Sequence, residues 1–197
     1  MLTVVNRLPV LAAIGVLFGC TITDEPPPTP ASALLAVQRI EPGAGPVQIN
    51  ELAQFRQTAL VVSDYCRSFN YVTDRQETAQ ALITRALKDY ASVLPGGLRV
   101  DIQSLKVRMR CHIAGAGGFS SYCAADASLS LTAIGNDRGG REIAVTASKE
   151  ATERVSVGMG VCASGMPAVT SAVDNVLAAA LVDIENGLSA RTGIPSR

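Results

Sequence analysis

The sequence predicts an α+β domain, an antiparallel sheet of about four strands with two helices packed on one face, in the order β-α-β-β-β-α. Two observations predict it. Several segments alternate apolar and polar residues, as strands with one buried face do, and two longer segments repeat apolar residues at helical spacing. Because each helical segment has a single apolar stripe, both helices should cover the same side of the sheet.

The first strand is expected in residues 58–66, where Ala59-Leu60-Val61-Val62 is a short apolar run typical of a buried strand. A helix should follow from about Asp74 to Val93, with Thr73 or Asp74 supplying the capping side chain at its start. The apolar stripe of this helix comprises Ala79, Leu82, Ile83, Ala86, Leu87 and Tyr90.

Two alternating segments, Leu98–Ile113 and a second from Cys123 to Leu131, predict a β-hairpin centred on Gly117. The apolar positions of the first segment change from even to odd numbers at Gln103-Ser104, so a β-bulge is expected there. The centre at Gly117 sets a register in which apolar side chains face one another: Cys111 with Cys123, Met109 with Ala125, Val107 with Ala127, and Leu105 with Leu129.

A further strand should follow the turn at residues 136–140, because residues 143–148 again alternate. The last helix is expected from about Pro167 to Asn186, with Gly187 as its stop. Its apolar stripe comprises Val169, Val173, Val176, Leu177, Ala180, Leu181 and Ile184.

Residues 1–19 have the layout of a secretory signal, since Arg7 precedes an apolar stretch and a small residue precedes Cys20. The ending Leu17-Phe18-Gly19-Cys20 resembles the lipobox of bacterial lipoproteins, and this resemblance implies cleavage before Cys20 and acylation of its thiol. Residues 20–33 are expected to form the lipidated cysteine and a tether, in which the proline-rich residues 24–33 are extended and span roughly 30 Å. A single domain at 34–190 and a tail at 191–197 complete the expected organisation.

The remaining four of the five cysteines are an even number, which favours two disulfides in an oxidising compartment. Direct opposition in the hairpin favours Cys111 with Cys123, and elimination leaves Cys66 with Cys162. The chain lacks a Cys-x-x-Cys motif and has one histidine, so neither a metal site nor a cofactor is expected.

The order of elements over residues 55–188, behind a lipobox and tether, resembles the small YajG-like envelope lipoproteins of bacteria. The hydrophobic pattern, the strand lengths and the closing helix with Ala172-Val173-Asp174-Asn175-Val176-Leu177 carry this resemblance. It implies an anchored envelope protein and no particular reaction. Because Thr21 rather than Asp follows the cysteine, the lipobox points to the periplasmic face of the outer membrane, with the inner membrane and the cell surface left open.

Composition argues against nucleic acid as a partner, because the 17 basic and 17 acidic residues balance and tryptophan is absent. The main hypothesis is a non-catalytic lipoprotein, not an enzyme, that binds or scaffolds another envelope protein; its small-molecule ligand, if any, is unknown. An alternative is an accessory of a transport system that carries a lipid or another ligand. A third is an enzyme with Cys162 or Cys111 as a thiol nucleophile served by His112.

A basic row, Lys106, Arg108 and Arg110, alternates with the apolar positions of the first hairpin strand and continues to His112. These side chains are candidate contacts for an anion or a partner, such as phosphate or lipid head groups. The competing interpretation is an ordinary solvated face in which Arg108 lies opposite Asp126.

Overall fold

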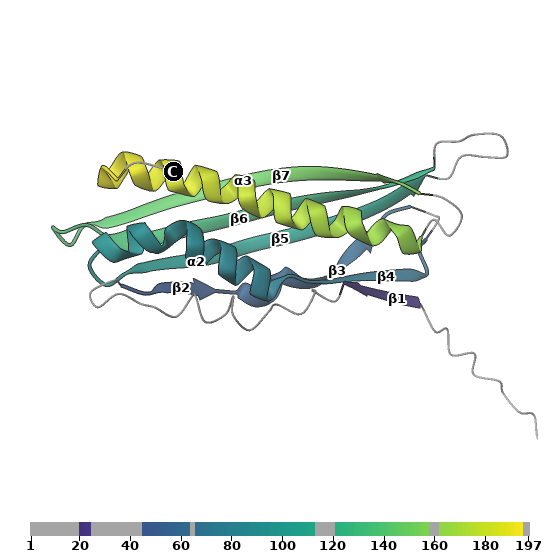
Figure 1. The fold of residues 1–197 in the computed structure, drawn as a ribbon, viewed down its shortest axis with the longest axis horizontal. Helices are drawn as coiled ribbons and strands as arrows, with labels where there is room; N and C mark the ends of the chain where they lie inside the picture. The colour runs from purple at the N-terminus through teal and green to yellow at the C-terminus, as the bar shows by residue number, and fades with distance from the viewer. Residues whose placement is uncertain (1–19, 25–44, 64–65, 113–120, 158–161, 195–197) are drawn as a thin grey trace, which may run out of the picture.

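The computed structural model describes residues 20–24, 45–63, 66–112, 121–157 and 162–194. The domain is elongated, and its long strands and longer helix run along the same axis (Figure 1). The predicted signal segment, Gly117 and residues 25–33 of the predicted tether lie outside the described residues. The elements are β1 (Cys20–Asp24), β2 (Val47–Asn50), the 3-10 helix η2 (Leu52–Phe55), β3 (Arg56–Val61), β4 (Phe69–Asp74), α2 (Gln76–Val93), β5 (Leu98–His112), β6 (Tyr122–Asn136), β7 (Glu142–Ser156), the 3-10 helix η3 (Ala163–Gly165) and α3 (Met166–Thr192).

The strands form one seven-stranded mixed sheet with the order β1-β4-β3-β5-β6-β7, and β2 also pairs with β5. β1 is parallel to β4, and β2 and β3 are parallel to β5. The predicted antiparallel sheet of about four strands, and its β-α-β-β-β-α order, are therefore wrong. The strands absent from the prediction are β1, β2 and β4, which have only four to six residues each. Such short segments offer too few alternating positions to reveal a period of two.

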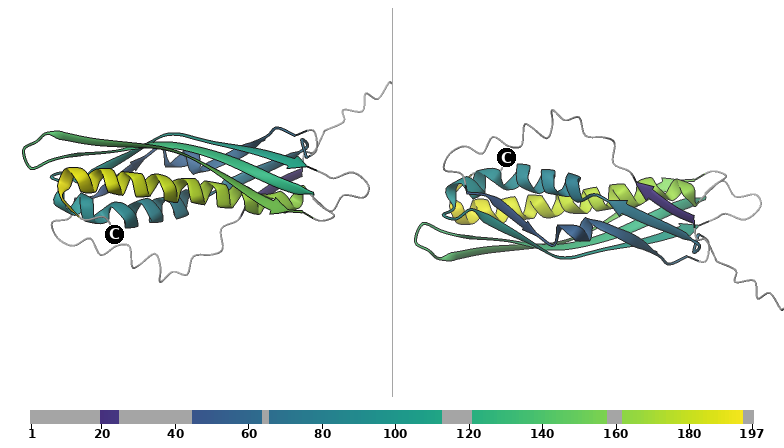
Figure 2. Two further views of the ribbon diagram at one scale, coloured as in Figure 1. Left: turned by 90° about the horizontal axis from the view of Figure 1, so that it is seen from above. Right: turned by 90° about the horizontal axis from the view of Figure 1, so that it is seen from below.

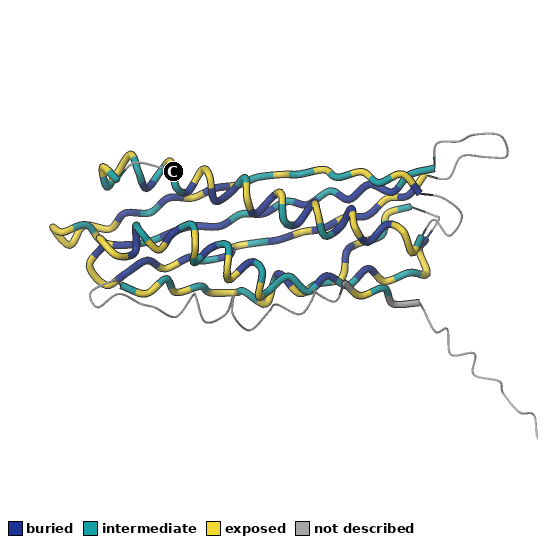
Figure 3. Tube along the Cα trace, viewed as in Figure 1, coloured by how far each residue is buried: buried dark blue, intermediate teal, exposed yellow. Residues whose placement is uncertain are grey.

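Both helices lie on one face of the sheet (Figure 2), where α3 packs on β6 and β7 and α2 packs beside α3. The core lies between these layers (Figure 3). Buried residues therefore alternate mostly with exposed ones along β5, whereas the central strand β6 has buried and partly buried residues and is exposed only at its last residue. Val169, Val173, Val176 and Leu177 of α3 are exposed by at most 1%. Burial of this stripe supplies the main driving force for docking the helix.

The start of α2 differs from the sequence prediction. Thr73 and Asp74, the expected caps, belong to β4, and α2 begins at Gln76 with no side-chain hydrogen bond at its N-cap Arg75. Instead, the guanidinium of Arg75 forms two hydrogen bonds with the carboxylate of Asp174 on α3, at 3.1 and 2.6 Å. This contact joins the start of α2 to α3, but it is not a cap, because a guanidinium cannot accept hydrogen bonds from the backbone amides of the helix.

The end of α3 also differs, because the helix passes Gly187 and ends at Thr192, inside the predicted tail. Gly187 is a packing residue rather than a stop: a Cβ atom added there would lie 2.4 Å from Cγ1 of Val145 on β7. The actual stop is Gly193, whose positive φ of 72° suits a helix C-cap. By length and composition, residues 163–192 could span a membrane, but over half of their most apolar window is buried in the domain. That burial is typical of a core helix.

The central hairpin has the predicted register. Cys111 lies opposite Cys123 and Leu105 opposite Leu129, and the register shifts between Ile102 and Ser104, where a bulge was expected. The bulge keeps the apolar side chains on the helix side of the sheet on both of its flanks. The opposite side, which we call the outer face, therefore receives the polar residues of β5, β6 and β7.

Candidate functional site

The basic row occupies the outer face of β5. Lys106, Arg108 and Arg110 are exposed, whereas Val107 and Met109 between them are buried under the helices. This arrangement follows from strand geometry, which sends successive side chains to opposite faces. Three cations therefore stand in a row on the outer face of β5, in a chain whose formal charge is zero overall.

Only part of this row is neutralised by contacts within the domain. Arg108 lies opposite Asp126 in the register, but the ion pair of Asp126 is with Nη2 of Arg110, at 3.2 Å. Thr152 on β7 donates a further hydrogen bond to the same carboxylate, at 2.7 Å. Within the described part of the chain, Lys106 and Arg108 form no ion pair, so their charges are available to a ligand.

Two aromatic rings lie next to the basic row, at the ends of β5 and β6 that the hairpin loop connects. The rings of His112 and Tyr122 have centroids 5.5 Å apart, and the guanidinium of Arg154 on β7 lies 3.4 Å from the centroid of the Tyr122 ring. A cation over an aromatic face is held by the ring quadrupole. Arg154 thus adds a further positive charge on the outer face near His112.

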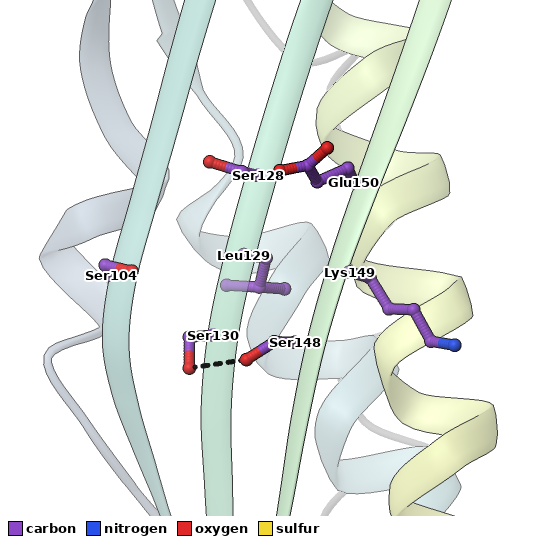
Figure 4. A pocket seen from close by; sticks show the side chains of 7 residues that line it. All are labelled: Ser104, Ser128, Leu129, Ser130, Ser148, Lys149 and Glu150. Atoms are coloured by element: carbon purple, nitrogen blue, oxygen red, sulfur yellow. Dashed lines mark hydrogen bonds between the residues drawn. The ribbon is translucent and has the colours of Figure 1, made fainter.

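A shallow depression of about 300 Å³ lies on the outer face (Figure 4), with Ser104, Ser128, Leu129, Ser130, Ser148, Lys149 and Glu150 around it. The Ser148 hydroxyl donates to that of Ser130, at 3.1 Å, and Ser130 donates to the side chain of Gln103, at 2.8 Å. Lys149 reaches away to Asp183 on α3, at 2.7 Å. These hydroxyls bond to one another and to an amide, and no imidazole or thiol lines the depression to activate them.

Both expected disulfides are present in the structure. One joins Cys66 to Cys162, 96 residues apart, and the other joins Cys111 to Cys123, 12 residues apart. The thiol that the enzyme hypothesis requires is thus consumed at both Cys162 and Cys111. Among the described residues, no three His, Cys, Asp or Glu side chains are grouped as metal ligands.

A tyrosine links the longer disulfide to the sheet. The hydroxyl of Tyr71 on β4 donates a 2.6 Å hydrogen bond to the carbonyl oxygen of Cys162. Burial disfavours the phenolate and raises the pKa of Tyr71 above its usual 10.0. This buried contact is structural and does not place Tyr71 on a ligand-accessible surface.

Cys20 is the first residue of β1, and the sequence had assigned residues 20–24 to the tether. It pairs with Phe69 at the start of β4, in a parallel register that continues to Asp24 opposite Thr73. The predicted lipid attachment residue is therefore part of the sheet. The short segment from Thr21 to Asp24 gave little sign of this, because Ile22 is its single apolar residue.

Comparison with known proteins assigns no family. The chain matches no protein-family model and no curated protein. Among solved structures, it is similar to a minor lipoprotein from Acinetobacter baumannii, with 9% identity over 68% of this chain and 91% of that chain and a TM-score of 0.39. A likeness at this level carries no conclusion about the function of the present chain.

Proposed function

We propose that this protein is an envelope lipoprotein anchored through acylated Cys20, on the periplasmic face of the outer membrane, where it acts as a non-catalytic binding or scaffold component for another envelope protein. The observation that carries the proposal is the lipobox-like sequence that ends at Cys20. Cleavage before this residue would leave β1 intact, because that strand begins at Cys20. The two disulfides suit a protein exported to an oxidising compartment.

The outer face supports a binding role better than a catalytic one. It offers an exposed surface on which Lys106 and Arg108 form no ion pair with any described residue. The depression on it is shallow, and two of its serines, Ser130 and Ser148, are hydrogen-bonded to each other. The carrier alternative requires an apolar groove between the helices and the sheet. The fully buried side chains of Val169, Val173 and Val176 fill that interface instead, so a binding surface is the better supported function.

The test is the intact mass of the protein extracted from membranes, measured before and after reduction and alkylation. We expect an acyl-modified chain that begins at Cys20 and whose other four cysteines react only after reduction. A Cys20→Ser variant is the matched control, and it should lose both the acyl mass and the cleavage. An unacylated wild-type chain would refute the anchor, and bound lipid in a native mass spectrum would favour the carrier alternative.

A further inference from the structure

We infer that the part of the outer face beside Cys20 docks directly on an anionic phospholipid bilayer, the same membrane that holds the anchor. We call this surface the docking patch; it comprises Leu60, Val62, Lys106 and Arg108, flanked by Arg110. The inference rests on the proposed acylation of Cys20. It adds that the domain lies against the lipid surface through its sheet instead of extending away from the membrane.

The register places Cys20 beside the patch. Ile22 pairs with Tyr71, and Tyr71 pairs with Ala59, so these residues form one row across β1, β4 and β3. The next residue of β3, Leu60, pairs with Arg108 on β5. Neighbouring strands are about 4.8 Å apart, so β1 and β5 are separated by roughly 14 Å across the sheet. This row faces the helices, since Tyr71 and Ala59 are buried, so the register gives the distance between the anchored strand and the patch. A bilayer that holds Cys20 is thus within about 14 Å of the patch across the sheet.

The exposed apolar residues fit such a surface. Leu60 in β3 is 60% exposed, and Val62, the residue after the end of β3, is 52% exposed. Ala59, the neighbour of Leu60, is buried because it points to the other side of the sheet. The backbone amide of Val62 donates to the carbonyl of Met109, at 2.9 Å, which continues the pairing of β3 with β5 beyond Val61. Binding at a membrane interface combines buried apolar area with attraction of cations to anionic lipids, and the patch offers both.

The local charge is also suitable. Lys106, Arg108, Arg110 and Arg154 are the cations of this part of the face, and they face the carboxylates of Asp126 and Glu150 on β6 and β7. On β3 and β4, Arg56 and Asp74 neutralise each other, with 3.5 Å between their charged atoms. The balance among these described side chains is positive. Each Lys or Arg near an anionic leaflet strengthens binding about fivefold.

A tryptophan reporter can test the docking, because the chain has no native tryptophan. Leu60→Trp is introduced into the mature acylated protein, which is then reconstituted into vesicles of zwitterionic lipid with or without phosphatidylglycerol. Emission should shift to the blue, and brominated phospholipid should quench it, when the anionic lipid is present. Val182→Trp is the matched control, since Val182 is 56% exposed but lies on α3, and its emission should not change.

Removal of positive charges then tests whether electrostatic attraction to anionic lipid holds the patch at the bilayer. In the Leu60→Trp background, Lys106→Gln with Arg108→Gln should lower the ratio of docked to undocked protein by roughly 25-fold, from about fivefold for each side chain. The exposed pair Arg85 and Lys88 on α2 provides a control with the same change in net charge. Arg85→Gln with Lys88→Gln should leave quenching unchanged.

The experiment separates docking from anchoring, because flotation of the protein with the vesicles in high salt reports the acyl anchor alone. Flotation without a change in Leu60→Trp emission would overturn the docking while leaving the anchor in place, and the basic row would then be assigned to an acidic protein surface. Equal loss of quenching in the α2 control would also overturn the proposal, because the effect would then come from net charge rather than from the patch.

Discussion

Removal of the long-range disulfide should destabilise the domain more than removal of the hairpin disulfide. The variants to compare are Cys66→Ala with Cys162→Ala, and Cys111→Ala with Cys123→Ala. The first bond spans 96 residues and the second spans 12. The chain-entropy relation gives a loss of about 4.7 kcal/mol for the first bond and about 2.8 kcal/mol for the second, a difference of about 2 kcal/mol.

Loss of packing should not reverse this order. Cys66, Cys111 and Cys123 are each at most 7% exposed, so alanine leaves small cavities in both variants. The longer bond also fixes the carbonyl that accepts the Tyr71 hydrogen bond. The difference in loop length therefore determines the expected ranking.

Urea unfolding followed by far-UV circular dichroism measures the effect, with the free energy taken from the midpoint and the slope. A loss of about 4.7 kcal/mol is a large part of the 5–15 kcal/mol typical of a domain, so the first variant should unfold at low urea or be unfolded without it. Wild-type protein in reductant should be less stable than either double variant. Equal midpoints for the two variants at equal slopes would refute the argument from loop length.

Three further predictions concern single contacts. Tyr71→Phe should lower the free energy of unfolding by about 1 kcal/mol at neutral pH, because it removes the hydrogen bond to the carbonyl of Cys162. The pKa of Tyr71 is raised in the folded state, so the stability of the wild-type protein should also decline as the pH rises above 10.0 through that pKa. Unfolding of the variant at alkaline pH should show a smaller decline. Gly187→Ala should cost about 1–3 kcal/mol in urea unfolding, since the new Cβ would meet Val145 at 2.4 Å, and Val145→Ala in the same chain should recover part of that loss. Thr73→Val should raise the melting temperature by removing a buried hydroxyl that has no hydrogen-bond partner among the described residues, and a lower value would contradict this reasoning.

The central hairpin could be predicted because its sequence constrains one register. Four apolar pairs and the parity change at Gln103-Ser104 all require the same alignment, and a slip by one residue would turn every apolar side chain toward solvent. The disulfide from Cys111 to Cys123 follows directly from that alignment. The basic row was predicted on the same grounds, as the alternate positions of β5.

The short strands could not be predicted in the same way, because tertiary pairing rather than a local pattern determines them. β2 has four residues and pairs in parallel with Leu98–Asp101, which are distant in sequence. In β4, Thr73 and Asp74 look like helix caps, yet Thr73 is buried between Gln57 and Asp24 in the sheet. A residue that is typical of a helix start can instead be part of a strand, when pairing with neighbouring strands extends the sheet past it.

The position of β1 shows that the proline-rich segment does not lie between Cys20 and the sheet. As a tether, residues 24–33 would hold the domain roughly 30 Å from a lipid on Cys20. Because β1 pairs Cys20 with Phe69, residues 25–33 follow the anchored strand in the chain and cannot separate Cys20 from the sheet. An acyl group on Cys20 would then hold one edge of the sheet at the membrane, and the docking patch at Leu60 and Arg108 lies only two and three strands from that edge.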